Sequence, residues 1–293
     1  MREFKKITLE ITEILRPYLY KSMNRLCDFS VGGTVMWRNA LDTHYAIYEG
    51  ALYMKVRLWN GKTAFTVPLG KPFAKTCPNL LEYCKNTGEK LVFTAVSNEE
   101  KNEMLRWFPN AEVVFERDFS DYIYLREDLA TFVGKRYSGQ RNHINRFLSE
   151  NPVWNFEEVS KENLPEIKEF FEKYNTETGK EAPTAVAERN GVREVLENFD
   201  VYGFFGEALR VDGKIIGFFL CEAVFDTLIV HIEKCERSVT GAYQMLAKEE
   251  AAKYCVDELK YVNREDDSGD EGLRKSKLSH HPFCIAEKYT VTI

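Results

Sequence analysis

The sequence lacks several features that would place it in a specialised class of protein. It has no run of about 18 consecutive apolar residues, so we expect no membrane-spanning helix. The opening residues MREFKKITLE have no apolar core of the kind that secretory signal peptides carry. No low-complexity segment and no long linker interrupts the chain. These absences predict a folded protein of the cytoplasm.

The seven cysteines also lack an informative spacing. There is no C-x-x-C pair, and an odd number fits poorly with a framework of disulfides. Reduced thiols are typical of the cytoplasm. The adjacent His280 and His281 point apart and make a poor pair of metal ligands, so we expect no metal site.

Basic residues are not in excess, since the chain has 40 Lys and Arg but 46 Asp and Glu. The net charge of −6 argues against general binding of nucleic acid, although a local basic patch can still bind phosphate. What the chain does have is enough apolar residues, 44% of the total, to bury a sizeable core. A length of 293 residues suggests one large domain or two of ordinary size.

Hydrophobic periodicity gives the order of elements. In the first half we expect helices at 7–23, 79–88 and 98–109, and strands within 44–70, 90–97 and 111–116. In the second half we expect helices at 134–152, 161–175, 186–199, 241–255 and 271–279, a three-stranded meander at 205–234, and strands at 259–263 and 283–292. Asn60-Gly61, Asp212-Gly213 and Asp226-Thr227 are predicted turns. This order indicates an α/β (α+β) fold with two tandem domains, 1–120 and 121–293, the second carrying the site.

The stretch HIEKCERSVTGAYQML joins a predicted strand to a predicted helix. Free N–H groups at a helix start favour an anion, Gly241 would let a ligand approach the backbone, and Arg237 could add a contact to phosphate. The alternative is an ordinary connection in which Thr240 is the N-cap.

A meander followed by such a loop and helix resembles the GCN5-related N-acetyltransferase folds, whose loop binds the pyrophosphate of acyl-coenzyme A. The resemblance implies a cofactor loop of Arg237, Thr240, Gly241 and Ala242. In RSVTGA, however, the glycine stands one place later than in the usual pattern of those folds.

Three blocks together carry a closer resemblance: GKRYSGQRNHINRF, HIEKCERSVTGAYQ and VNREDDSGDEGLRKSKLSHHP. They resemble a family of uncharacterised bacterial proteins that is similar to the C-terminal catalytic domain of phosphatidylglycerol lysyltransferase, and more distantly to the Fem peptidyltransferases. The resemblance implies two tandem acetyltransferase-like domains, each a mixed, mainly antiparallel sheet flanked by helices. It also implies acyl-coenzyme A or aminoacyl-tRNA as the donor, and a small molecule or lipid headgroup as the acceptor.

Four residues are candidates for the chemistry. His231 and Glu233 are two apart on one predicted strand and share a face of the sheet, where either could accept a proton from an amine. Asn263 and Glu265 stand at the end of the next predicted strand, beside loops where α/β folds place ligands. The alternative for His231 is a buried histidine with a hydrogen-bond partner.

Basic and amide side chains from distant segments are candidates to bind a phosphate-bearing substrate. The set comprises Lys135, Arg136, Arg141, Asn142, Arg264, Arg274 and Lys275. The alternative is a solvated helix face for the first four and a structural ion-pair network for the others.

The leading hypothesis is an aminoacyl- or acyltransferase acting on an amine or hydroxyl. The alternatives are an N-acyltransferase that uses acyl-coenzyme A, and a non-catalytic module that binds an anionic ligand.

Overall fold

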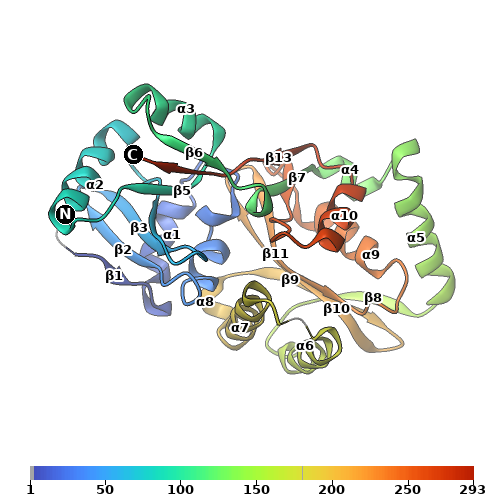
Figure 1. Cartoon of the computed structure of the whole chain (residues 1–293). Helices are drawn as coiled ribbons and strands as arrows, with labels where there is room; N and C mark the ends of the chain where they lie inside the picture. Colours follow the sequence, from blue (N-terminus) through green and yellow to red (C-terminus); the bar gives the residue numbers. More distant parts are fainter. Residues whose placement is uncertain (1–2, 180) are drawn as a thin grey trace. The chain divides into compact units, whose positions relative to one another are not determined.

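The computed structural model describes residues 3–179 and 181–293. The chain forms two compact units, one of the residues up to Asp121 together with Ile285–Ile293, the other Tyr122–Cys284. It contains two seven-stranded, mainly antiparallel sheets flanked by helices (Figure 1). The predicted fold class is therefore confirmed. None of the helices within the described ranges is long and apolar enough to cross a membrane.

The sheet of the first unit has the strand order β1-β2-β3-β4-β5-β14-β6. Its strands are β1 (Lys5–Lys6), β2 (His44–Tyr48), β3 (Ala51–Arg57), β4 (Thr63–Thr66), β5 (Val92–Val96), β6 (Glu112–Phe115) and β14 (Tyr289–Thr292). The helices are α1 (Thr12–Leu19), α2 (Phe73–Thr87) and α3 (Asn98–Trp107). Phe73, Cys77 and Leu80 of α2 pack on Tyr53, Phe65 and Phe93 of the sheet, which forms the core of this unit.

The last strand joins the first sheet. β14 pairs in antiparallel register with both β5 and β6. The sequence had placed residues 283–292 as one strand of the second domain, whereas the structure has two strands, β13 (Cys284–Ala286) and β14. Strand partners this distant in sequence are chosen by packing across the whole chain, which a local hydrophobic pattern does not specify.

The sheet of the second unit has the order β13-β7-β12-β11-β10-β9-β8. Its remaining strands are β7 (Asp121–Leu125), β8 (Trp154–Glu158), β9 (Phe205–Val211), β10 (Lys214–Val224), β11 (Thr227–Cys235) and β12 (Tyr261–Asn263). The predicted meander is β9-β10-β11, whose neighbours pair antiparallel. β11 and β12, by contrast, run parallel.

Helices cover both faces of this second sheet. They are α4 (Arg126–Thr131), α5 (Ser138–Glu150), α6 (Leu164–Thr178), α7 (Pro183–Glu197), α8 (Phe199–Tyr202), α9 (Ala242–Glu249) and α10 (Glu271–Ser279). In Figure 1, α6 and α7 lie on one face and α4 and α9 on the other. Phe170 and Phe171 of α6 meet the ring of Phe218 on β10 edge to face, which fixes α6 on the sheet.

Gly241 precedes α9 because a side chain does not fit there. Its φ of +87° lies in the left-handed region. A Cβ at this position would lie 2.1 Å from the carbonyl oxygen of His143 on α5. The glycine that the sequence suggested for ligand approach thus lets α5 and α9 pack closely.

Replacing Gly241 by Ala should destabilise the protein more than replacing Gly213, a left-handed glycine with open space around it. Gly213→Ala should cost the backbone penalty alone, about 1–2 kcal/mol. Gly241→Ala should add an overpacking cost of about 1–3 kcal/mol. The free energies of unfolding, measured with urea, should differ in this order. Equal losses in the two variants would show that the α5–α9 contact does not constrain residue 241.

Candidate functional site

His231 lies at an irregularity in the sheet. In the pairing of β10 with β11, Leu220 lies opposite Ile232 and Cys221 opposite Val230, so His231 is the extra residue of a β-bulge. Bulges re-aim side chains and are frequent next to active sites. On the other side of β11, the parallel register pairs Ile229 with Asn263. Two residues further along in each of the two segments, the same register places His231 beside Glu265.

Two carboxylates hold the His231 ring. Its Nδ1 donates to Glu265 Oε1 at 2.6 Å, and its Nε2 donates to Glu222 Oε1 at 2.7 Å. The ring stacks on Phe204, with 5.0 Å between centroids. The side chains of His231 and Glu222 are buried, whereas that of Glu265 is 18% exposed. Solvent therefore reaches this hydrogen-bonded triad only through Glu265.

The triad keeps His231 positively charged at neutral pH. Burial lowers the pKa of His231, but the hydrogen bonds and negative charges of Glu222 and Glu265 outweigh burial and raise that pKa to about 9. An imidazolium donates from both ring nitrogens, which matches its two carboxylate acceptors. The sequence suggested His231 as a proton acceptor; the geometry makes it a fixed donor that orients Glu265.

Glu265 occupies a strained backbone position. Its φ is +56°, which is uncommon for a residue other than glycine. Asn263 Oδ1 accepts the Glu265 N–H at 2.6 Å, and the Glu265 carbonyl accepts from the N–H of Tyr122. Oε1 is bonded to His231, while Oε2 has no partner among the described residues. Strain held in place this firmly is a feature of functional sites.

Arg264 precedes Glu265, but its side chain has different partners and forms a buried ion pair. It donates to Glu233, and its Nε lies 4.0 Å from Glu250 Oε2. Glu250 begins a π-helical turn, Glu250–Tyr254, and is fully buried. Neither of its carboxylate oxygens has a hydrogen-bond partner in the described chain. Burial first, and then the charge of Glu233, raise the pKa of Glu250 well above its usual value.

The segment after β12 is fixed at further points. Lys277 donates to the carbonyl oxygens of Arg264 and Asp266. Asp267 accepts two hydrogen bonds from Arg274, at 2.7 and 2.9 Å, and one from the hydroxyl of Tyr122. The result is a rigid polar turn that presents Glu265.

The candidate substrate-binding residues differ in their contacts. Arg141 donates to the carbonyls of Phe132 and Gly134, and Arg136 pairs with Asp128. Arg264 and Arg274 are held by Glu233 and Asp267, as described above. Arg264 and Arg274 thus have the ion pairs of the structural network that the sequence left open as the alternative, whereas Arg136 and Arg141, for which the alternative was a solvated helix face, are bonded to groups of the protein. Three other members are exposed and have no partner within residues 3–179 and 181–293: Lys135, Asn142 and Lys275.

Some residues of the predicted cofactor loop are available to a ligand and others are not. Arg237 is exposed and has no partner in the described part of the chain. Thr240 is half-buried and forms no side-chain cap for α9, so it is not the N-cap that the sequence offered as the alternative. Gly241 packs on α5, and the N–H of Ala242 donates to the carbonyl of Val239 at 3.3 Å. This use of Gly241 and Ala242 leaves less of the loop available to an anion.

Two further acidic residues were missed by sequence reasoning. Glu222 stands within the apolar run GFFLCEAVF, and Glu250 within the helical run AKEEAAKY. An acid in the middle of a buried strand needs a partner, and this is the signal that could have identified Glu222.

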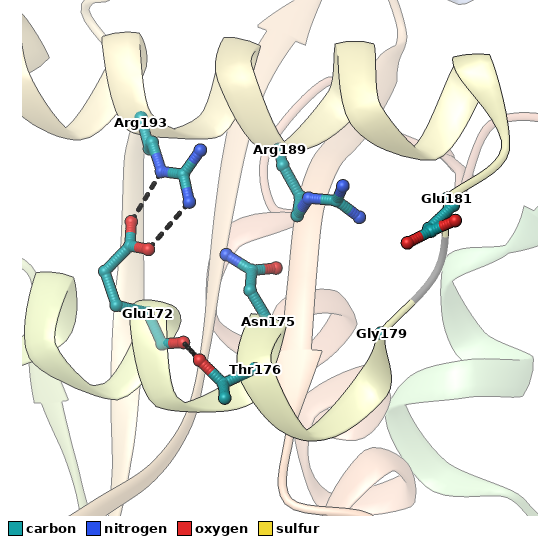
Figure 2. A pocket seen from close by; sticks show the side chains of 7 residues that line it. All are labelled: Glu172, Asn175, Thr176, Gly179, Glu181, Arg189 and Arg193. Atoms are coloured by element: carbon teal, nitrogen blue, oxygen red, sulfur yellow. Dashed lines mark hydrogen bonds and ion pairs between the residues drawn. The ribbon is translucent and has the colours of Figure 1, made fainter.

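A cavity of about 250 Å³ lies between α6 and α7 (Figure 2). Its charges are balanced, with Arg189 and Arg193 against Glu172 and Glu181. Arg193 grips Glu172 through two hydrogen bonds of 2.6 and 2.7 Å. Because its charged residues come in equal numbers of each sign, this cavity favours no particular charged substrate.

One group of metal-ligand type lies in the described part of the first unit, formed by Cys27, Asp28 and Asp121. The ammonium of Lys288 lies 2.6 Å from Asp28 Oδ2 and 2.7 Å from Asp121 Oδ1. A lysine therefore supplies the positive charge there.

Comparisons with known proteins assign the chain to a family. A family model described as "Phosphatidylglycerol lysyltransferase, C-terminal" matches residues 21–292. The chain belongs to this family. A conserved protein of unknown function from Bacteroides thetaiotaomicron is 32% identical, with a TM-score of 0.91 over all of both chains.

A solved structure with a more informative name shares the fold, and a curated protein resembles the chain in sequence. The L-PGS of Bacillus licheniformis is 14% identical over 96% of this chain and 91% of its own, with a TM-score of 0.67. An uncharacterised protein of Mycoplasmoides gallisepticum is 24% identical over 187 residues, which are 63% of this chain and 59% of that relative. The family and fold support a domain of the acyl- or aminoacyltransferase type.

The charge of His231 should be visible directly. In NMR spectra of histidine-labelled protein, the ring of His231 should remain an imidazolium at pH 7.5 and titrate near pH 9. Since this pKa is above the unfolded value of about 6.5, its contribution to stability is full below pH 6.5 and is lost as the pH rises through 9. His231→Gln assigns the resonance. Titration near 6.5 would contradict the assignment of the charge.

Removing Arg264 should be strongly destabilising, because it leaves Glu233 without its counter-charge. We expect Arg264→Ala to lower the free energy of unfolding by about 3–5 kcal/mol. Arg237→Ala, at an exposed arginine without a partner, should change it by less than about 0.5 kcal/mol. Urea denaturation measures both. A loss for Arg264→Ala as small as that of the control would mean that the pair is not needed for folding.

Proposed function

We propose that the protein transfers an activated aminoacyl or acyl group to a hydroxyl or amine, and that Glu265 is the residue that contacts the acceptor. The observation that carries the proposal is the unpartnered Oε2 of Glu265 at the exposed end of a buried triad. Membership of a family described as a lysyltransferase supplies the reaction class.

Glu265 suits an acceptor that carries a proton to be removed. An ionised carboxylate only accepts hydrogen bonds, so Oε2 would orient the O–H or N–H of the acceptor toward the activated carbonyl. As the new C–O or C–N bond forms, the proton of the acceptor passes to Oε2. The bond to the leaving group then breaks, and the leaving group departs with the electron pair and a proton from solvent.

The surrounding residues position Glu265. The imidazolium of His231 holds Oε1, Glu222 holds the imidazolium, and Asn263 fixes the backbone. Such support keeps a reacting group within a narrow range of positions, which contributes to the rate.

Of the two possible donors, an aminoacyl ester fits the site better than acyl-coenzyme A does. The loop that would bind a pyrophosphate uses the Ala242 N–H internally and packs Gly241 against α5. Arg237, Lys135 and Lys275 remain available to phosphates of a large donor such as aminoacyl-tRNA.

Transfer assays test the proposal. The protein is incubated with radiolabelled lysyl-tRNA and vesicles that contain phosphatidylglycerol, and separately with labelled acetyl-coenzyme A and free amines. We expect labelled product in the first assay. The absence of transfer in both, for protein shown to be folded, would contradict the proposed reaction.

Glu265→Gln should lower the turnover number by about 10²-fold or more, the range of general base catalysis. The matched control is Glu258→Gln, at an exposed glutamate in the same unit. Glu258→Gln should keep the wild-type melting temperature, and Glu265→Gln, whose amide oxygen can still accept the hydrogen bond from His231, should remain folded at the assay temperature. Unchanged turnover for Glu265→Gln would remove Glu265 from the mechanism while leaving the reaction class intact.

A further inference from the structure

A buried cluster of charged and thiol groups lies in the first unit, and the proposed function assigns it no role. It consists of Cys27, Asp28, Asp121 and Lys288. All four residues belong to the same compact unit. Asp121 and Lys288 are buried and Cys27 is 7% exposed, whereas the side chain of Asp28 is 34% exposed. A small solute therefore reaches the cluster from the side of Asp28.

The amine of Lys288 lies against the sulfur of Cys27. The distance from Nζ to Sγ is 3.4 Å, which is close to van der Waals contact. The same ammonium binds Asp28 and Asp121, and these two carboxylates are sufficient partners for its charge. The thiol is therefore a further group within reach of the amine, so that a nitrogen nucleophile lies beside an oxidisable sulfur.

Backbone contacts hold the two groups in this arrangement. The N–H of Cys27 donates to Asp121 Oδ2 at 2.8 Å. The N–H of Lys288 donates to the hydroxyl of Ser120 at 3.2 Å, and its carbonyl accepts from the N–H of Glu116 at 2.8 Å. Because neighbouring residues, Ser120 and Asp121, bind the two backbones, the sulfur and the amine are kept together although they come from opposite ends of the chain.

The surroundings of Cys27 favour its reaction with an oxidant. Its thiol donates to Asp121 Oδ1 at 3.4 Å, so a carboxylate is in place to take the proton. A lysine ammonium beside the sulfur stabilises the thiolate, which is the reactive form. The other two cysteines of this unit differ, since burial raises the pKa of Cys77 and of Cys84 to about 11. Of the three thiols, that of Cys27 is therefore the best placed to react.

We propose that a peroxide joins Cys27 to Lys288 through a covalent bond between sulfur and nitrogen. In the first step, the sulfur attacks one peroxide oxygen and the O–O bond breaks. The departing hydroxide takes the former thiol proton from Asp121 and leaves as water, and Cys27 becomes a sulfenic acid. Sulfenic acids condense with nitrogen nucleophiles that lie within reach.

In the second step, the ammonium of Lys288 gives one proton to Asp28, which passes it to solvent. The amine then attacks the sulfur, the S–O bond breaks, and the hydroxyl leaves as water with a second proton of the nitrogen. Thiol, ammonium and one peroxide thus give the link, two water molecules and one proton. The sulfur loses the two electrons that the peroxide gains. This inference does not rest on the proposed transferase reaction.

Peptide mapping of oxidised protein tests the link. The Cys284→Ser variant is used, because the exposed thiol of Cys284 can form disulfides between copies. The folded protein is treated with hydrogen peroxide, alkylated with iodoacetamide in denaturant, digested with trypsin and analysed by mass spectrometry. We expect a cross-linked peptide that contains Cys27 and Lys288, lacks two hydrogen atoms and is not cleaved after Lys288. Dithiothreitol should release both peptides.

A cross-linked peptide heavier by one oxygen atom would also support the pair. In that case a second peroxide has placed an oxygen between sulfur and nitrogen, and one further water has been released. The proposal is overturned if peroxide leaves Cys27 as a thiol, or takes it to a sulfinic acid while trypsin still cleaves after Lys288.

Two matched variants and one change of conditions serve as controls. Cys27→Ser should abolish the cross-link and restore cleavage after Lys288. Cys84→Ser, at another buried cysteine of this unit, should leave the yield unchanged. Peroxide added to protein unfolded in urea should give no cross-link, because the two groups are then apart. An equal yield in urea, or a loss of the link in Cys84→Ser as complete as in Cys27→Ser, would contradict the role of the folded geometry.

Discussion

A buried imidazolium between two carboxylates is the interaction on which the second unit depends. Glu222 on β10, His231 on β11 and Glu265 after β12 each come from a different stretch of the sheet, and the ring joins all three. Burying any one of these charges alone would be costly, whereas hydrogen-bonded opposite charges offset that cost. The bulge at His231 is what turns the ring toward both acids. The same interaction therefore fixes the edge of the parallel β11–β12 pair and aims Glu265.

The neighbouring polar contacts have a common effect. Arg264 is drawn to Glu233 on one side of the chain while Glu265 is drawn to His231 on the other, and Lys277 binds the carbonyls between them. A segment held from both sides tolerates the left-handed backbone of Glu265. The consequence is a partly exposed side chain whose second carboxylate oxygen is held in place and can still accept a hydrogen bond.

Hydrophobic periodicity predicted most helices and the β9-β10-β11 meander, because each depends on local sequence. It did not place β14, whose partners β5 and β6 lie nearly two hundred residues earlier in the chain. Within the site, the two-residue spacing of His231 and Glu233 predicted a shared face, yet the bulge gives them different partners, Glu265 and Arg264. Arg141 was predicted as a ligand of phosphate because the sequence shows its charge but not the carbonyls that accept its hydrogen bonds.

The role of Glu265 can be seen in a crystal structure with a stable amide analogue of an aminoacyl ester and a short alcohol as acceptor. We expect the acceptor oxygen to lie within about 2.6–3.2 Å of Glu265 Oε2, next to the carbonyl carbon of the analogue. His231 should keep both of its carboxylate partners in that complex. An analogue bound away from Glu265, or an Oε2 occupied by a protein group when the ligand is present, would contradict it.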